Sequence, residues 1–523
     1  MTTVRKLRLG TRRSALAWVQ SSQVAAELMA AHPGLEVELV GIDTRGDRVL
    51  DKPLSAMDGK EFFTAELDEA LRGGHVDFSV HSLKDLSLER PPDFVLAAVP
   101  VRANPRDLAL FAPDVPQRLA EEAGLRIGTS SPRRGTLLPP FFTRALPHGA
   151  RNGIELVTLR GNVDTRLRRL HEPRGSERHL DGIVLAAAGL SRLFADTSTE
   201  RQGRKLLEGL LDGLHLMMLP LTEVPGAPGQ GALAVECRAA DAETRSLLAV
   251  LEHAETRAAV AIERQLLGEH GGGCHQRFGA SLQWLPGLGS VLQVAGRNAQ
   301  DADIGEQRFL PDPPLPELPA TVQAWDGSQA ASAPGSTLVD ANGLAAELRG
   351  GAVFVAHQRA LPEGAAGALA GRTVWTAGAK TWFALAAAGV WVQGCAESLG
   401  AEGAARLIAE PLLRLPPPAG WDVLTHAAAT GPWQQGRWAG ANVIATYTVG
   451  DAVEVDAAGL AAATHIYWSS TAQFERCRHL ANPAAHHASG AGKTAEHIRR
   501  AGVRNFRAFP SPEAWRRWTA KGH

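Results

Sequence analysis

The chain has 523 residues, of which 45% are hydrophobic and 21% are charged, so it can bury several cores and is long enough for about three to five domains. Lys and Arg total 54 against 55 Asp and Glu, and the net charge of -1 excludes a general attraction to nucleic acid or to an anionic membrane surface. Any anion site must therefore be a local cluster of cations.

The first residues lack the apolar run of a secretory signal, and no segment reaches the roughly 18 uninterrupted apolar residues of a membrane span. We therefore expect a cytoplasmic protein. The four cysteines show no close metal-type pairs, so we predict free thiols, no disulfide framework and no metal site. They are Cys237, Cys274, Cys395 and Cys477.

Short apolar segments alternate with amphipathic ones from residue 6 to about residue 280, the pattern of α/β domains with sheets covered on both faces. After a Pro-, Ala- and Ser-rich stretch with linker composition, a second α/β region begins near residue 338. The predicted strands cover residues 7–10, 37–42, 78–80, 125–128, 156–159, 182–186 and 232–235. The predicted helices cover residues 14–31, 64–71 and 242–267.

Polar residues cluster where four of these strands end. In open α/β sheets, ligands bind at the carboxyl ends of strands, where loops and helix N-termini offer free amide groups. Arg suits bidentate carboxylate binding, so the clusters predict a ligand with several carboxylates. Any one of these arginines, taken alone, is more often a solvated surface charge. The clusters are residues 10–14, 81–85, 128–134 and 159–166.

Seven sequence motifs occur in one order across about residues 5–309: LRLGTRRSALAWVQ, DFSVHSLKDL, IGTSSPRRG, LRGNVDTRL, DGIVLAAAGLSRL, PGQGALAVECR and GGGCHQRFGA. This region resembles the hydroxymethylbilane synthase (porphobilinogen deaminase) family. The resemblance implies an α/β multidomain protein with two α/β lobes like those of periplasmic binding proteins and a small α+β domain that carries the cofactor. The expected boundaries are residues 1–103 plus about 205–238 for the first lobe, 104–204 for the second lobe and 239–310 for the cofactor-carrying domain.

The resemblance also implies a transferase of tetrapyrrole (haem) biosynthesis that joins four porphobilinogen molecules stepwise to hydroxymethylbilane and expels ammonia each time. The growing polypyrrole would be carried on a dipyrromethane cofactor bound covalently to Cys274, in the segment Gly271-Gly-Gly-Cys274. Glycines allow the backbone to move, and a thiol is a strong nucleophile. Free cysteines are more often small buried residues, an interpretation that Cys237 keeps. No nucleic acid or membrane partner is expected, and we expect a monomer.

Asp85 matches the catalytic aspartate of the family. Loss of ammonia needs a proton donor and leaves a cationic pyrrole, so one carboxylate can act as acid, base and counter-ion in turn. By the same resemblance the cofactor is held by Lys84, Ser130, Ser131, Arg133 and Arg134. The substrate is held by Arg12, Ser14, Lys60, Ser82, Arg160 and Arg166.

Two segments depart from the family pattern. Glu61 follows Lys60 where the family usually has glycine, which makes Lys60 the least secure of the binding residues. Pro139-Pro140 should interrupt the helix that follows Arg134 within about two turns. The segment from residue 141 to 153 resembles an insertion.

The C-terminal part contains an internal repeat, which implies two similar α/β lobes. Residues 353–357 align with 466–470, Lys380-Thr381 with Lys493-Thr494, and residues 389–390 with 502–503, all at the same offset. This pattern resembles uroporphyrinogen-III synthase, a lyase that inverts the last ring of the bilane. The expected boundaries are 311–337 for a linker and 338–523 for this region, with lobes at about 338–446 and 450–523. The resemblance singles out Thr381, Tyr447, Ser470 and Thr494.

Other interpretations stay open. The usual opening strand and Arg-Pro turn of that second family are not visible, and Ala356-His357 stands where Thr-Ser is common. The C-terminal region is therefore either a second enzyme or a degenerate, non-catalytic domain. The whole chain could also be a two-lobed anion-binding protein, but simple binding needs neither Asp85 nor Cys274.

Overall fold

A computed structural model describes residues 5–44, 64–195, 201–270, 276–285, 287–327, 335–450 and 455–520. The chain forms two compact units. One is built from residues 1–143, 150–282 and 293–306, and the other from residues 144–149, 283–292 and 307–523.

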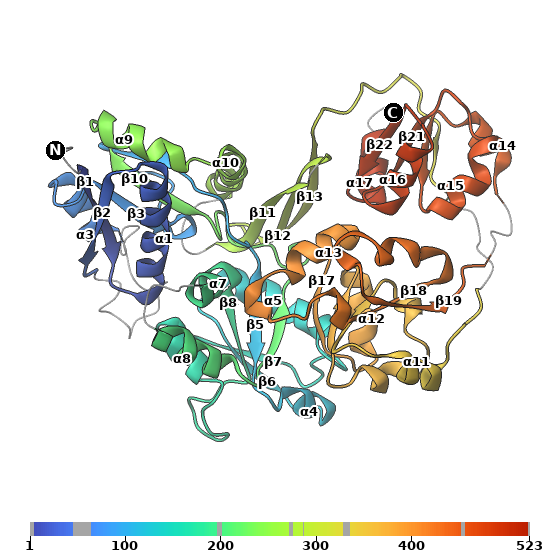
Figure 1. Cartoon of the computed structure of the whole chain (residues 1–523), viewed down its shortest axis with the longest axis horizontal. Helices are drawn as coiled ribbons and strands as arrows, with labels where there is room; N and C mark the ends of the chain where they lie inside the picture. The colour runs from blue at the N-terminus through green and yellow to red at the C-terminus, as the bar shows by residue number, and fades with distance from the viewer. Residues whose placement is uncertain are drawn as a thin grey trace. The chain divides into compact units, whose positions relative to one another are not determined.

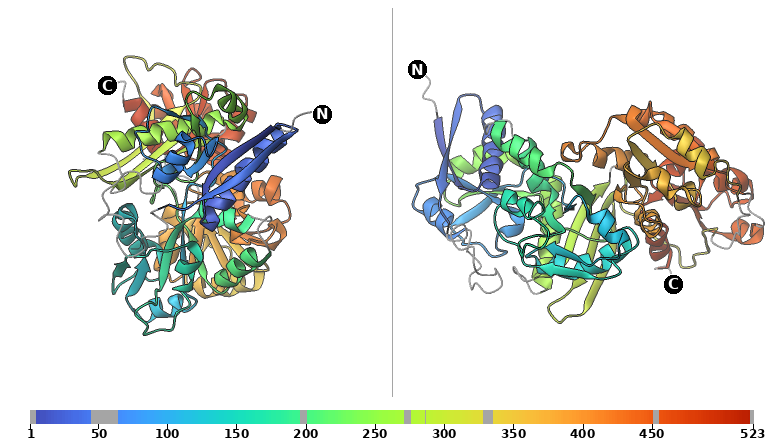
Figure 2. Two further views of the ribbon diagram at one scale, coloured as in Figure 1. Left: turned by 90° about the vertical axis from the view of Figure 1, so that its left-hand side faces the viewer. Right: turned by 90° about the horizontal axis from the view of Figure 1, so that it is seen from below.

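The first sheet has the strand order β2-β1-β3-β10-β4. Strand β1 runs parallel to β2 and β3, whereas β10 runs antiparallel to β3; β1 and β2 are drawn in dark blue (Figure 2). Helix α1 begins after Ser14, whose hydroxyl accepts a hydrogen bond from the backbone N–H of Ala17, and it packs Val24 and Leu28 on Leu9 and other core residues of the sheet. The elements are β1 Arg5–Arg12, α1 Ala15–Ala31, β2 Leu35–Ile42, α3 Ala65–Arg72, β3 Phe78–Ser82, the 3₁₀ turn η2 Leu83–Asp85, β4 Phe94–Ala98 and β10 Leu233–Arg238.

The second sheet has the order β7-β6-β8-β5-β9, and Figure 1 labels β5, β6, β7 and β8. Strand β9 pairs with β5 in this sheet, so the chain returns to the first sheet later than the boundary near residue 205 that the sequence predicts. The elements are β5 Asp107–Phe111, α4 Val115–Ala120, β6 Leu125–Gly128, α5 Pro132–Ala145, β7 Ile154–Val157, α6 Val163–Arg168, β8 Gly182–Ala186, α7 Ala187–Ala195, α8 Arg201–Leu211 and β9 His215–Met218.

Helix α5 contradicts the prediction that Pro139-Pro140 interrupts it, because it continues to Ala145 with both prolines inside. An interior proline costs about 3 kcal/mol relative to alanine. The opposing contribution is burial: Leu138, Phe141 and Phe142 are almost fully buried, and each such side chain contributes about 1.5–3 kcal/mol. Packing therefore outweighs the local preference.

The single helix predicted over residues 242–267 is two helices. The imidazole of His253 caps the second one by accepting a hydrogen bond from the N–H of Thr256, and Glu252 turns back to bind the N–H of Val99 at 2.8 Å. A three-stranded sheet in the order β11-β12-β13 follows. The elements are α9 Ala242–Leu248, the 3₁₀ turn η3 Ala249–Leu251, α10 Ala254–Glu269, β11 Arg277–Leu285, β12 Gly289–Arg297 and β13 Asp303–Pro311.

The C-terminal region contains two parallel sheets, in the orders β17-β16-β15-β18-β19 and β14-β20-β21-β22. Strand β14 lies within the predicted linker and pairs with β20, so this stretch is part of the second sheet. The strands are β14 Ala324–Trp325, β15 Ala352–Val355, β16 Thr373–Thr376, β17 Val392–Cys395, β18 Trp421–His426, β19 Asn442–Tyr447, β20 His465–Trp468, β21 His486–Gly490 and β22 Phe506–Phe509. The helices are α11 Ala341–Glu347, α12 Ala379–Ala387, α13 Gly400–Ile408, α14 Ala457–Ala462, α15 Thr471–Cys477, α16 Lys493–Arg500 and α17 Pro512–Thr519.

A buried ionic network connects α3, β3 and β10. Arg90 donates to Asp68 of α3 and to Glu236 of β10 through both of its terminal nitrogens and Nε, at 2.7–3.1 Å. His81, on β3, lies 3.0 Å from the hydroxyl of Ser79 and 3.4 Å from Glu236. Burial lowers the pKa of His81 to about 3, and the positive charges of Arg90 and Arg12 act in the same direction. His81 is therefore neutral at physiological pH.

This burial makes stability depend on pH. An unfolded His81 takes up a proton near pH 6.5, whereas the folded one does not until about pH 3. The unfolded state thus binds more protons in this window, and stability is lost as the pH falls. Between pH 7.5 and 5.5 the protein should lose about 1.4 kcal/mol of unfolding free energy relative to His81→Gln, measured by urea denaturation of both proteins. Equal losses would contradict the neutral state of His81.

Candidate functional site

The centre of the candidate site is Asp107, the first residue of β5, which is fully buried. Strand β5 runs antiparallel to β8, and β8 runs parallel to β6. The start of β5 therefore lies at the carboxyl end of β6, and α5 begins after that end. Arg133 Nη2 donates to Asp107 Oδ2 at 2.8 Å, and Arg134 donates through Nε at 3.1 Å and Nη2 at 2.8 Å. Burial alone would raise the pKa of Asp107, but the two guanidinium groups hold it well below its usual range. Asp107 therefore fixes both arginines.

A second branch connects Asp107 to the end of β3. Gln230 Nε2 donates to Asp107 Oδ1 at 2.9 Å, and its Oε1 accepts a hydrogen bond from Lys84 Nζ at 3.3 Å. Burial lowers the pKa of Lys84, and the neighbouring Asp85 carboxylate opposes this effect. Lys84 and Asp85 follow β3 in the 3₁₀ turn η2. The ends of two different sheets thus share one hydrogen-bonded network.

Arg160 and Arg166 complete the cluster from the loop after β7 and from α6. Burial lowers the pKa of Arg166 to about 10; the charges of Arg134 and Arg160 act in the same direction, and that of Asp85 opposes them. The Nε of Arg166 donates to the carbonyl of Gly161 at 2.7 Å. Gly161 has a φ of +107°, which favours glycine. Within the described part of the chain, Arg160 Nη1 is buried without a hydrogen-bond partner.

The two predicted serines beside these arginines make local hydrogen bonds. Ser130 donates to the carbonyl of Leu159, which joins the loops after β6 and β7. The Ser131 hydroxyl accepts a hydrogen bond from the backbone N–H of Arg134 at 3.5 Å, at the start of α5. Their observed contacts stabilise the loops that carry the arginines.

The predicted residues of the first sheet are placed as follows. Arg12 ends β1 and contributes to the positive potential at His81. Ser14 caps α1, and Ser82 exchanges hydrogen bonds with Gln20 at 3.2 and 3.3 Å. Lys60 and Cys274 lie outside the described residues.

This arrangement suits a ligand with several carboxylates. One fixed carboxylate, Asp107, is shared by two arginines, while Lys84, Arg160 and Arg166 add three further cations beside exposed Asp85. Like charges held this close are destabilising unless anions neutralise them. The buried nitrogen of Arg160 gives such an anion a direct donor.

The other cysteines have a different environment. Cys237, Cys395 and Cys477 are buried, and burial raises the pKa of Cys237 to about 11. A thiol reacts as its thiolate, so burial of this kind makes these three groups poor nucleophiles.

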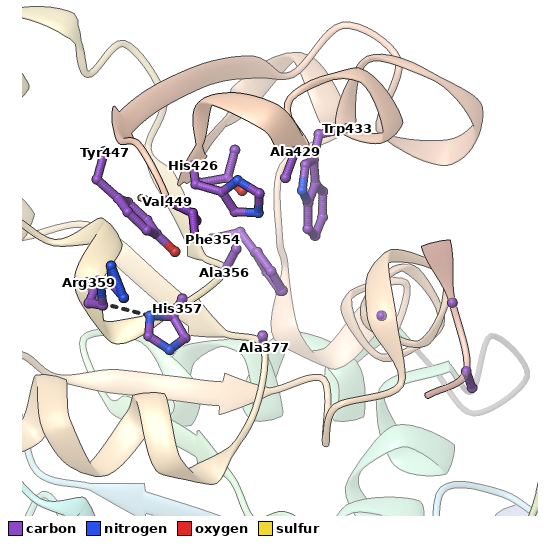
Figure 3. A pocket seen from close by; sticks show the side chains of 14 residues that line it. Phe354, Ala356, His357, Arg359, Ala377, His426, Ala429, Trp433, Tyr447 and Val449 are labelled. Carbon is purple, nitrogen blue, oxygen red and sulfur yellow. Dashed lines mark hydrogen bonds between the residues drawn. The ribbon is translucent and has the colours of Figure 1, made fainter. Parts of the chain in front are cut away.

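A separate cavity of about 450 Å³ lies in the C-terminal region. Figure 3 shows Tyr447, Arg359 and His357 on one side of it and Trp433 opposite. The Arg359 guanidinium lies 5.3 Å from the ring centre of Tyr447, and the backbone N–H of Arg359 donates to His357 Nδ1 at 3.1 Å. Burial lowers the pKa of His357, as do the charges of Arg359 and Lys380. His357 is thus neutral with its proton on Nε2. The cavity combines aromatic walls with a cation, the guanidinium group of Arg359.

Of the four residues that the sequence singles out in this region, Tyr447 lines the cavity. Thr381 and Thr494 lie in the first turns of α12 and α16, and Ser470 caps α15 by accepting a hydrogen bond from the N–H of Gln473. The structure does not bring these three into the cavity wall.

Sequence reasoning missed Asp107, Gln230, His357 and Arg359. Asp107 precedes an apolar strand and follows Arg106, so it has the pattern of an exposed charge. Gln230 lies inside the motif PGQGALAVECR, so the motif itself could have identified it as a candidate site residue. In the sequence, His357 stands out only as a departure from the Thr-Ser of the synthase family.

Comparisons with known proteins find relatives of the N-terminal part of the chain. Residues 7–246 match the sequence model of the porphobilinogen deaminase dipyrromethane cofactor binding domain. The chain is 45% identical over 272 residues to porphobilinogen deaminase of Roseiflexus sp. (strain RS-1), covering 52% of this chain and 80% of that protein. It is 41% identical over 295 residues to the enzyme of Syntrophotalea carbinolica, covering 55% and 84%, and 43% identical over 295 residues to that of Xanthomonas oryzae pv. oryzae, covering 56% and 86%.

Among solved structures, the methionine-binding protein MetQ aligns with 49% of this chain and 93% of its own, at 12% identity and a TM-score of 0.27, which is too low to support an inference. No helix among the described residues has the length and apolar character needed to cross a membrane. The sequence matches are decisive: the chain belongs to the porphobilinogen deaminase family, whose cofactor is a dipyrromethane attached to a cysteine.

Proposed function

We propose that this chain joins porphobilinogen units through the carboxylate of Asp85, while the surrounding cations hold the carboxylates of the pyrrole chain. One observation carries the proposal: Lys84, Arg134 and Arg166 interact electrostatically with one another or with Asp85 at the meeting of two sheet ends. A stepwise synthesis of hydroxymethylbilane from four porphobilinogen molecules follows from the family.

The residues fit the dipyrromethane cofactor, whose acetate and propionate groups need several cationic donors. Lys84, Arg133 and Arg134, with the serines at 130 and 131, would hold it, and the buried Arg160 Nη1, which has no hydrogen-bond partner among the described residues, would be available to a further carboxylate. When bound, the cofactor supplies the pyrrole carbon at which the chain grows. We assign its attachment to Cys274, because the three described cysteines are buried and a nucleophilic thiol needs access.

Asp85 has two roles in this proposal. It holds a proton at the aminomethyl nitrogen of porphobilinogen, so that the nitrogen leaves as ammonia, and it balances the positive charge that develops on the pyrrole. The exposed position of Asp85 at the end of η2 supports this assignment because the carboxylate can reach a ligand. Arg12, Ser14, Lys60, Ser82, Arg160 and Arg166 are proposed to bind the substrate carboxylates.

The domain division is part of the same proposal. The first lobe would be the β2-β1-β3-β10-β4 sheet, the second lobe the β7-β6-β8-β5-β9 sheet, and the cofactor-carrying domain the region of α10 and β11-β12-β13. Both lobes would then bind the carboxylates of the ligand, the first lobe through Lys84 and the second through Arg134.

Asp85→Asn should keep the shape of the site and lose its proton donor and counter-ion. We expect kcat to fall by at least roughly 10²- to 10⁴-fold, with porphobilinogen still bound and the cofactor still present by intact mass. Glu89→Gln, which changes an exposed carboxylate in the same loop, is the control and should keep normal turnover. Near-normal turnover of Asp85→Asn would refute the role.

The second candidate function concerns the C-terminal region. We propose that it acts as a uroporphyrinogen-III synthase on the bilane made by the N-terminal part, and the cavity favours this over a degenerate domain. Its volume of about 450 Å³ lies within the range of ligand pockets. Its aromatic walls suit pyrrole rings, Arg359 suits their carboxylates, and Tyr447 lies where the synthase family has a tyrosine.

We relate strand β14 to the opening strand of the synthase family, which the sequence does not reveal. Strand β14 is only two residues long, yet it pairs in parallel with β20 as the edge of the second C-terminal sheet. Thr381, Ser470 and Thr494 start helices in equivalent halves of the repeat, where they would act by positioning backbone amides.

The product isomer tests this second function, because free hydroxymethylbilane closes to the type I macrocycle. With porphobilinogen, the wild-type chain should yield type III after oxidation and separation of the isomers. Ala356→Trp places a large side chain in the cavity wall and should release type I at an unchanged rate of porphobilinogen use. Ala501→Trp, at an exposed helix end, is the control and should yield type III. Type I from the wild-type chain would sink the synthase assignment.

A further inference from the structure

The backbone of the turn that carries Lys84 and Asp85 is held by one side chain from another element. A 3₁₀ turn leaves carbonyl groups without partners inside the helix. Arg264 Nη1 donates to the carbonyls of Leu83 at 3.2 Å and Leu86 at 3.0 Å, and Arg264 Nη2 donates to the carbonyl of Ser87 at 2.7 Å. One guanidinium group therefore binds the carbonyls on both sides of Asp85.

Arg264 is suited to this task by its surroundings. Among the described residues, its side chain donates to the carbonyls of Leu83, Leu86 and Ser87, in the turn and directly after it. Burial lowers the pKa of Arg264 and the charge of Arg90 acts in the same direction, while the Glu236 carboxylate opposes them. Leu83 and Leu86 are buried beside it, so the turn is fixed by packing on one side and by the guanidinium on the other.

Helix α10 is itself firmly anchored. Glu263, next to Arg264, accepts hydrogen bonds from Arg102 and from the backbone N–H groups of Gly229 and Leu282, at 2.6–2.9 Å. Adjacent residues of one helix thus bind the loop before β10, strand β11 and the Asp85 turn. In the chain, α10 is also the helix that precedes the segment with Cys274.

We propose that Arg264 is a positioning residue: it fixes the Asp85 turn to α10, so that the carboxylate keeps its place relative to the helix that leads to Cys274. This inference rests on the proposed roles of Asp85 and Cys274. Arg264 acts on Asp85 through the backbone carbonyls on both sides of it. Its loss should therefore lower kcat more than it raises KM, because small displacements of a catalytic group can cost about 10²-fold in rate.

The test compares Arg264→Gln and Arg264→Lys with Arg257→Gln. Arg257 lies on the same helix and also donates to a backbone carbonyl, that of Leu96 at 3.2 Å, and to Glu252 at 2.9 Å, but not to the turn. We expect Arg264→Gln to lower kcat about 10- to 100-fold with KM for porphobilinogen within about threefold. Arg264→Lys, which keeps the charge but not the planar fork, should lose less. Arg257→Gln should keep kcat.

Hydrogen exchange gives a readout that does not depend on activity. Amide exchange of residues 83–87 should rise in Arg264→Gln and not in Arg257→Gln, while intact mass shows that both retain the cofactor. If Arg264→Gln fails to fold, Arg264→Lys carries the same comparison. A normal kcat in the Arg264 variants, or an equal loss of kcat in Arg257→Gln, would overturn the inference. If Asp85→Asn is inactive in the same assay, the proposed function still stands. Normal turnover of Asp85→Asn would overturn both.

Discussion

The buried carboxylate of Asp107 is the constraint on which the site depends. Without it, Arg133 and Arg134 would be two adjacent buried cations, and breaking a buried ion pair typically costs about 3–5 kcal/mol. Through Gln230 the same carboxylate is also connected to Lys84, in the turn that follows β3 of the first sheet. One anion thus holds together a set of cations that would otherwise repel one another. The cluster keeps a net positive charge, which suits the carboxylates of a pyrrole chain.

Buried and exposed charged groups have different roles in this arrangement. Buried groups such as Asp107, Glu236 and Glu263 bind arginines and backbone amides, and they give the loops fixed positions. Exposed Asp85 stands at the end of a turn, and Arg264, the neighbour of Glu263 on α10, binds the carbonyls of Leu83 in this turn and of Leu86 just beyond it. The proposed chemistry needs a carboxylate in a fixed position, and the hydrogen bonds from Arg264 fix the backbone around Asp85. The C-terminal cavity differs, because its cation and aromatic rings lie in its wall without a buried carboxylate among the lining residues.

The sequence predicted much of this fold because periodicity and caps are local. Ser14 as the start of α1 and the strands at residues 125–128 and 182–186 are confirmed. It failed where tertiary packing opposes local preference: α5 passes through Pro139-Pro140 because Phe141 and Phe142 are buried, and His253 divides a helix that its neighbours would continue. In the site, Lys84, Asp85 and the arginines follow recognisable strand ends, whereas Asp107 reaches them only through an antiparallel strand order that local sequence does not encode.

The central claim is that this cation cluster serves a pyrrole chain carried by Cys274. Its most direct test is the mass of the purified full-length chain, followed by mapping of the modified peptide, with Cys274→Ser and Cys237→Ser as paired variants. The account predicts a mass that exceeds the sequence mass by one dipyrromethane, found on the peptide with Cys274, lost in Cys274→Ser and kept in Cys237→Ser. An unmodified but active protein, or a dipyrromethane on another cysteine, would contradict it.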